Sequence, residues 1–145
     1  MGYQVWHDYG YGIRVSDIHK HSVERLRILL RYAPQLNASM NNYLEACGIT
    51  EPTWDDYMDY DADCGCGLAT ILAELLLEVE DVSFLSCSDY DGELYLIYTP
   101  SYPWATRESE RNLTIEHINQ MLLKYIAILT DEKISIDYMS VENGG

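Results

Sequence analysis

The amino-acid sequence predicts an α+β domain, with an antiparallel sheet of about 4–5 strands and helices packed mainly on one face. Helical stretches fall before and after a β-hairpin signal, instead of alternating with strands as in a doubly wound parallel sheet. Hydrophobic residues make up 48% of 145 residues, which is enough for one buried core. No repeat or linker interrupts the chain, so we expect a single acidic domain over residues 1–145.

The first third predicts strands followed by a helix. Residues 3–15 alternate apolar and polar side chains, and Gly10 and Gly12 favour a turn or bulge, so we expect a hairpin or two short strands. Ser22 is expected to cap a helix over about residues 23–32.

Four further helices are predicted, three before the hairpin and one after it. One spans residues 38–47 and is closed by Gly48. A short one over 54–58 is capped by Thr53, and the apolar stretch 68–80 predicts a central core helix. Beyond the hairpin, a helix capped by a threonine is expected over 115–129.

The remaining elements are strands. Residues 82–87 and 93–98 are rich in β-formers, and the Asp91-Gly92 pair between them is a strong hairpin signal. Residues 133–141 alternate as a last strand. Among the aromatic residues, Tyr95, Tyr125 and Tyr138 are expected in the core, and four others in loops or short elements are expected at contacts: Tyr57, Tyr60, Tyr90 and Tyr102.

Charge is distributed unevenly along the chain. The net charge is −15, and residues 32–106 contain 14 acidic side chains without a single Lys or Arg. Folded proteins usually mix both signs, because a surface of one sign repels itself. The pattern is interpreted either as simple solubility or as a negative surface for a positively charged partner.

The densest acidic stretch, residues 51–63, interleaves carboxylates with aromatic rings. Side chains on one face of a strand lie about 6.5 Å apart, and helix neighbours lie about 5–6 Å apart. Both intervals are comparable to the spacing of backbone phosphates, so such a row can compete for an Arg- and Lys-lined groove. A solvated acidic loop is the other interpretation. The candidate partner-binding residues here are Glu51, Asp55, Asp56, Tyr57, Asp59, Tyr60, Asp61 and Asp63, joined by Asp89, Asp91 and Glu93 of the hairpin.

Two motifs resemble metal sites only in part. Residues 59–63 read like the first half of a calcium-binding EF-hand loop, but Cys64 stands where glycine is needed and Thr70 where a glutamate is needed. The Cys64-Gly65-Cys66 spacing is tighter than that of common zinc pairs. We expect no metal and no cofactor.

Enzyme signatures are absent from the sequence. It has no nucleophile motif, no glycine-rich phosphate loop and no His-Glu pair at zinc-protease spacing. It has neither a signal-peptide pattern nor a run of about 18 apolar residues that would span a membrane. The four cysteines are therefore expected to be reduced, and the protein to be a cytoplasmic, non-enzymatic binding protein.

In size, acidity and lack of an enzyme motif, the chain resembles the small acidic inhibitor proteins of phages and mobile elements, such as anti-CRISPR and antirestriction proteins. These inhibitors share no residue motif, so no residue role is carried over. The resemblance implies a DNA mimic in a host bacterial cytoplasm that occupies a basic nucleic-acid-binding surface of a CRISPR effector nuclease or a restriction enzyme. Direct nucleic-acid binding is not expected, because the net charge of −15 repels a polyanion.

Two alternatives belong to other classes. One is an immunity-type or accessory protein that binds a basic protein partner without mimicking DNA. The other is a small metal-binding module or enzyme that uses Asp59, Asp61, Asp63 or the two close cysteines.

The metal alternative is tested by chelation. If no metal takes part in folding, excess EDTA leaves the melting temperature unchanged, because a metal bound only by the native state would add to its stability. Differential scanning fluorimetry with and without EDTA measures this. A drop of more than about 5 °C that is reversed by added metal would contradict the expectation.

Overall fold

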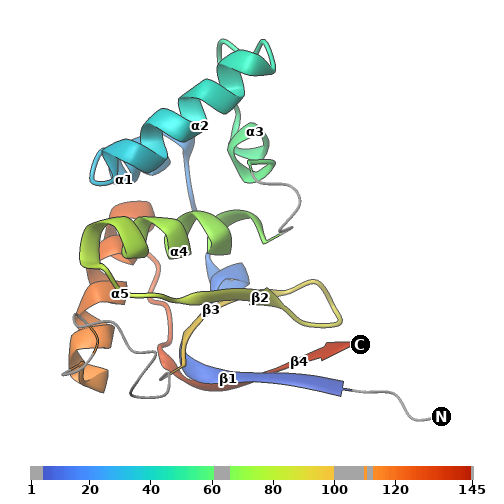
Figure 1. Cartoon of the computed structure of the whole chain (residues 1–145), viewed down its shortest axis with the longest axis vertical. Coiled ribbons are helices and arrows are strands. Elements are labelled where there is room, and N and C mark those ends of the chain that lie inside the picture. The colour runs from blue at the N-terminus through green and yellow to red at the C-terminus, as the bar shows by residue number, and fades with distance from the viewer. Residues whose placement is uncertain (1–4, 61–65, 100–109, 111–112, 145) are drawn as a thin grey trace.

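The computed structural model describes residues 5–60, 66–99, 110 and 113–144. Figure 1 shows a sheet at one end of the molecule and helices stacked above it. In chain order the elements are β1 (Val5–Arg14), the 3-10 turn η1 (Val15–Asp17), α1 (Val23–Leu30), α2 (Pro34–Ala46), α3 (Trp54–Met58), α4 (Gly67–Glu80), β2 (Leu85–Ser88), β3 (Leu94–Tyr98), α5 (Ile115–Leu129) and β4 (Asp137–Gly144).

The described strands form one antiparallel sheet in the order β2-β3-β1-β4. β1 is central: it pairs with β3 from Tyr11↔Tyr98 to Arg14↔Tyr95 and with β4 from Val5↔Gly144 to Gly12↔Asp137. β2 and β3 pair as the expected hairpin. The predicted fold class, an α+β domain with an antiparallel sheet, is confirmed.

The α4 helix lies between the sheet and the layer formed by α1, α2 and α3 (Figure 1). Its apolar side chains face both the sheet and the α1–α3 layer. A helix that is hydrophobic on most sides is stable only when other elements cover most of its surface. The buried residues of α4 are Leu68, Ala69, Thr70, Ile71, Leu72, Leu75 and Leu76. A smaller apolar cluster of Cys87, Ile97 and Val141 forms separately from this core. No helix among the described residues has both the length and the apolar character needed to cross a membrane.

The N-terminal stretch is one strand of ten residues, so the expected hairpin or pair of short strands is wrong. Gly10 and Gly12 do not make a turn. A Cβ at Gly12 would lie 2.0 Å from the Leu96 carbonyl oxygen, and one at Gly10 would lie 2.6 Å from that of Tyr98. Glycine is required at these positions because the β3 backbone approaches β1 too closely for any side chain.

Local capping signals located the helix starts. Ser22, Thr53 and Thr114 each accept a hydrogen bond from a backbone N–H of the first turn that follows. α2 starts at Pro34, four residues earlier than expected, and has no side-chain cap. Proline is favourable at a first helical position, and Glu78 of α4 accepts from the backbone N–H of Gln35 at 3.0 Å and of Leu36 at 2.8 Å.

The last strand begins at Asp137, four residues later than expected, and this changes which side chains are covered. Tyr138 is 67% exposed, so its assignment to the core is wrong. It lies on the edge strand β4, where its ring packs edge-on against Tyr11 with a centroid distance of 5.2 Å. Tyr125 of α5 is 1% exposed, as expected.

The contact between β1 and β3 gives a prediction for Gly12→Ala. The added methyl meets a backbone carbonyl that cannot rotate away, so we expect a loss of about 3 kcal/mol in the free energy of unfolding. Gly48→Ala is the comparison: nothing lies within 4 Å of its Cβ, but φ is +73°. It should lose only about 1–2 kcal/mol from backbone strain. Urea denaturation measures both, and an equal loss would contradict the steric explanation.

Candidate functional site

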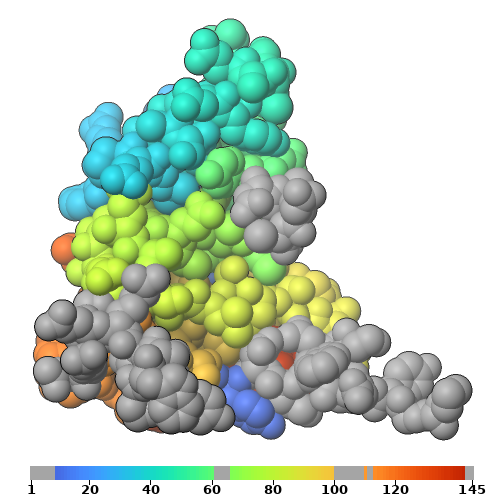
Figure 2. Space-filling view, viewed as in Figure 1, coloured from blue at the N-terminus to red at the C-terminus, as the bar shows by residue number. Residues whose placement is uncertain are grey.

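Two acidic segments that are about thirty residues apart in the sequence meet at one groove. The groove has a volume of about 480 Å³ and is lined by Val15, Ser16, Ile18, His21, Trp54, Met58, Asp59, Gly67, Leu68, Gly92 and Leu94. The two segments approach each other at Gly67. A Cβ at this residue would lie 3.7 Å from the Sδ of Met58 and 3.8 Å from the Cδ1 of Leu94. Figures 1 and 2 show α3 and the β2–β3 turn at the same end of α4. We call this site the acid-rimmed groove.

An aromatic pair forms one wall of the acid-rimmed groove. The rings of His21 and Trp54 are stacked, with centroids 3.7 Å apart and planes at 10°. The segment before His21 is held by Glu132, whose Oε1 accepts from the backbone N–H groups of Lys20 and His19. The hydrogen bond from Lys20 has the largest effect on the pKa of Glu132, and together with that from His19 it lowers this pKa below its usual value. Desolvation acts in the opposite direction but is outweighed. No pattern in the sequence predicted this pair.

The α3 segment contains both structural and exposed acids. Asp56 accepts from the backbone N–H of Thr53 at 2.8 Å, while the Thr53 hydroxyl accepts from the N–H of Asp56, which completes a capping box. Asp55 and Asp59 are exposed. Asp56 therefore stabilises the helix start, whereas its two neighbours face solvent.

The aromatic residues of this segment are less available than expected. Tyr57, predicted as a contact residue, is 3% exposed, and its hydroxyl accepts a hydrogen bond from the Nε of Arg27 at 3.2 Å, so little of its ring is open to a partner. Tyr60 is half-buried against Tyr43, with ring centroids 5.7 Å apart. The spacing of residues in the sequence could not distinguish these rings, because burial depends on α1 and α2 packing over α3.

The β2–β3 turn is held together by one carboxylate. The Oδ1 of Asp89 accepts from the backbone N–H groups of Asp91 at 2.9 Å and Glu93 at 3.0 Å, and its Oδ2 accepts from the Tyr95 hydroxyl at 3.0 Å. Desolvation alone would raise the pKa of Asp89, but these bonds and the charge of Arg14 outweigh it and lower the pKa. Asp89 thus stays ionised, and both oxygens of its carboxylate are used in hydrogen bonds that hold the turn.

The two other turn acids differ in availability. Glu93 forms an ion pair with Arg14 at 3.2 Å. Asp91 is exposed, and within the described residues its carboxylate has no hydrogen-bond or ion-pair partner. The same holds for three acids of the 51–60 segment, which gives four available carboxylates in all: Glu51, Asp55, Asp59 and Asp91. Asp61 and Asp63 lie outside the described residues, as does Tyr102.

The described residues show no grouping of three His, Cys, Asp or Glu side chains that could hold a metal ion. Thr70, at the twelfth position of the EF-hand-like stretch, is buried in α4 and lies 3.5 Å from the Ser86 hydroxyl. Cys66 is also buried, and desolvation raises the pKa of its thiol despite hydrogen bonds with Thr70 and Ser86. Neither residue is placed to coordinate an ion at the surface.

The arrangement suits a long cationic side chain. Met58, Leu68 and Leu94 offer an apolar surface for an aliphatic stem, and Asp59 at the edge offers a carboxylate for its charged end. Such a site can hold an Arg or Lys of a partner without any covalent chemistry.

The turn carboxylate gives a prediction for Asp89→Asn. Because the pKa of Asp89 is depressed in the folded state, its contribution to stability is complete above the unfolded pKa of about 3.9 and is lost as the pH falls below that value. The variant should therefore be less stable than the wild type at neutral pH, with the difference shrinking towards about pH 3. Urea midpoints across this range measure it. Asp91→Asn is the matched control, and an equal effect there would contradict the assignment.

The chain was compared with models of protein families, with curated proteins and with solved structures. None of the three comparisons gives a match.

Proposed function

We propose that the protein is an acidic inhibitor that occupies a basic nucleic-acid-binding surface of a host defence nuclease, such as a CRISPR effector nuclease or a restriction enzyme. The observation that carries the proposal is the acid-rimmed groove. Asp59, which follows α3, and Gly92 of the β2–β3 turn line this groove together with the stacked His21–Trp54 pair. Asp55 and Asp91 are exposed acids of the same two segments.

Clustering matters more than total charge. Interactions between exposed charges are screened over about 8 Å at physiological salt, so carboxylates scattered over the molecule would act singly. Asp59 and the turn that carries Asp91 border the same groove, although they are far apart in the sequence. A basic surface that approaches this end of the molecule therefore meets several charges at once, which favours fast association.

The groove also provides a pocket for an anchoring side chain, which a flat acidic surface does not. Binding energy at protein interfaces is concentrated in anchors that fill pockets, and Arg is among the most frequent anchors. Surfaces that bind nucleic acids are rich in Arg and Lys. An Arg of the nuclease that normally contacts a phosphate can lay its stem along Met58 and Leu94 and direct its guanidinium towards Asp59.

The proposal predicts the effect of replacing Asp55, Asp59 and Asp91 together with Asn. These side chains have no partner among the described residues, so stability should change by less than about 1 kcal/mol. Inhibition should weaken by about tenfold, mainly through slower association, and its salt dependence should flatten. The measurement is target-DNA binding by a purified nuclease identified by pull-down from a bacterial extract, titrated with each variant at two salt concentrations.

The matched control replaces Glu24, Glu116 and Glu142 with Gln, which removes the same charge from exposed positions outside the α3 segment and the β2–β3 turn. This control should inhibit like the wild type. Equal weakening by both triple variants would show that only total charge matters. A captured partner whose nucleic-acid binding is unaffected would instead favour an immunity-type or accessory protein.

A further inference from the structure

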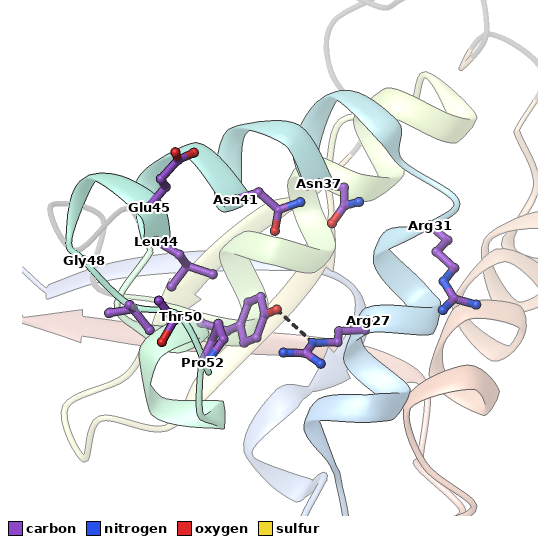
Figure 3. A pocket seen from close by; sticks show the side chains of 11 residues that line it. Arg27, Arg31, Asn37, Asn41, Leu44, Glu45, Gly48, Thr50 and Pro52 are labelled. Carbon is purple, nitrogen blue, oxygen red and sulfur yellow. Dashed lines mark hydrogen bonds between the residues drawn. The ribbon is translucent and has the colours of Figure 1, made fainter.

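A second pocket, of about 500 Å³, lies between α1, α2 and the loop that follows α2. Figure 3 shows Asn37 and Asn41 projecting from α2 towards α1, Arg27 reaching from α1, and Arg31 at one end. These four side chains carry only hydrogen-bond donors or amides, in a protein whose net charge is −15. The acid-rimmed groove shares none of the residues that line this pocket.

Neither Arg27 nor Arg31 has an acidic partner in the part of the chain that the structure describes. They are one turn apart on α1, where like charges slightly destabilise a helix. Arg14 and Arg25 both form ion pairs, with Glu93 and with Asp131. Within the described residues, the Arg27 side chain has only the bond from its Nε to the Tyr57 hydroxyl, and the Arg31 side chain has no hydrogen bond or ion pair. With 24 acids available to 9 Lys and Arg, two arginines that line one pocket without an acidic partner among the described residues favour an anionic ligand.

The rest of the lining fits a ligand larger than a simple ion. Leu44, Ile49 and Pro52 give the pocket an apolar side, and Glu45 is the one acid that lines it. A volume of about 500 Å³ falls within the range of small-molecule sites, which is about 300–1,000 Å³. The planar forks of two Arg side chains match the oxygens of a phosphate, and each guanidinium can donate two parallel hydrogen bonds.

We propose that this pocket binds a small phosphorylated molecule of the nucleoside monophosphate class. Arg27 and Arg31 hold the phosphate. Asn37 and Asn41 donate to the phosphate or to neighbouring hydroxyls, and the apolar side formed by Leu44, Ile49 and Pro52 contacts the remainder of the ligand.

Isothermal titration calorimetry with adenosine 5′-monophosphate and with inorganic phosphate, at low salt, tests the proposal. We expect saturable binding of the monophosphate, with weaker binding of phosphate alone. Arg31→Gln should weaken binding by about tenfold, since a charge-assisted hydrogen bond is lost. Because Arg31 has no partner among the described residues, its replacement should leave the melting temperature unchanged.

Lys133→Gln is the matched control. It removes the same charge from an exposed residue outside the pocket and should bind like the wild type. Absence of saturable monophosphate binding would overturn the proposal. So would equal weakening by Lys133→Gln, or inorganic phosphate binding as tightly as the monophosphate. Loss of binding in Arg31→Gln alone supports it, and this readout does not depend on any nuclease.

Discussion

The burial of α4 is the constraint on which the rest of the structure depends. Its apolar side chains cannot all be covered by one layer, so the sheet covers one side and the α1–α3 layer the other. Each fully buried Leu or Ile contributes about 1.5–3 kcal/mol, and α4 has several of them. The same packing places α3 and the β2–β3 turn at one end of α4, which creates the acid-rimmed groove.

Carboxylates also serve inside this architecture, in roles that the net charge does not reveal. Glu78 accepts from two backbone N–H groups at the start of α2, and Glu80 accepts from the Tyr125 hydroxyl at 3.0 Å. Glu132 holds the segment before α1, and Asp89 holds the β2–β3 turn. A negative group at a helix start is favourable, because unpaired N–H groups concentrate positive charge there. Part of the acidity is therefore structural, and only the remainder is available to a partner.

Features set by neighbouring residues could be predicted from the sequence. The caps Ser22, Thr53 and Thr114 and the Asp91-Gly92 turn depend on side chains within a few positions, and all appear where expected. The apolar run of α4 was equally clear, because few polar residues interrupt it.

Features set by distant residues could not be predicted. Gly10 and Gly12 read as turn residues, since nothing local shows that β3 will approach them. Tyr57 and Tyr90 look alike in sequence, but only the first is covered by α1 and α2. The acidic residues of the 51–63 stretch and of the β2–β3 turn were recognisable, but their division into a cap, an ion pair and exposed carboxylates depends on Thr53 and Arg14. No sequence pattern predicted the stacking of His21 on Trp54, or that Arg27 and Arg31 would have no acidic partner among the described residues.

The position of β1 has a consequence for the order of folding. The central strand of the sheet is the first in sequence, and one of its neighbours, β4, is the last, with register pairs such as Val5↔Gly144. Pairing across so large a sequence separation is entropically costly and slow. The β2–β3 hairpin and the helices can form from local contacts while the chain is still being synthesised. Until the last strand emerges from the ribosome, however, β1 lacks one neighbour and exposes a hydrogen-bonding edge to other chains.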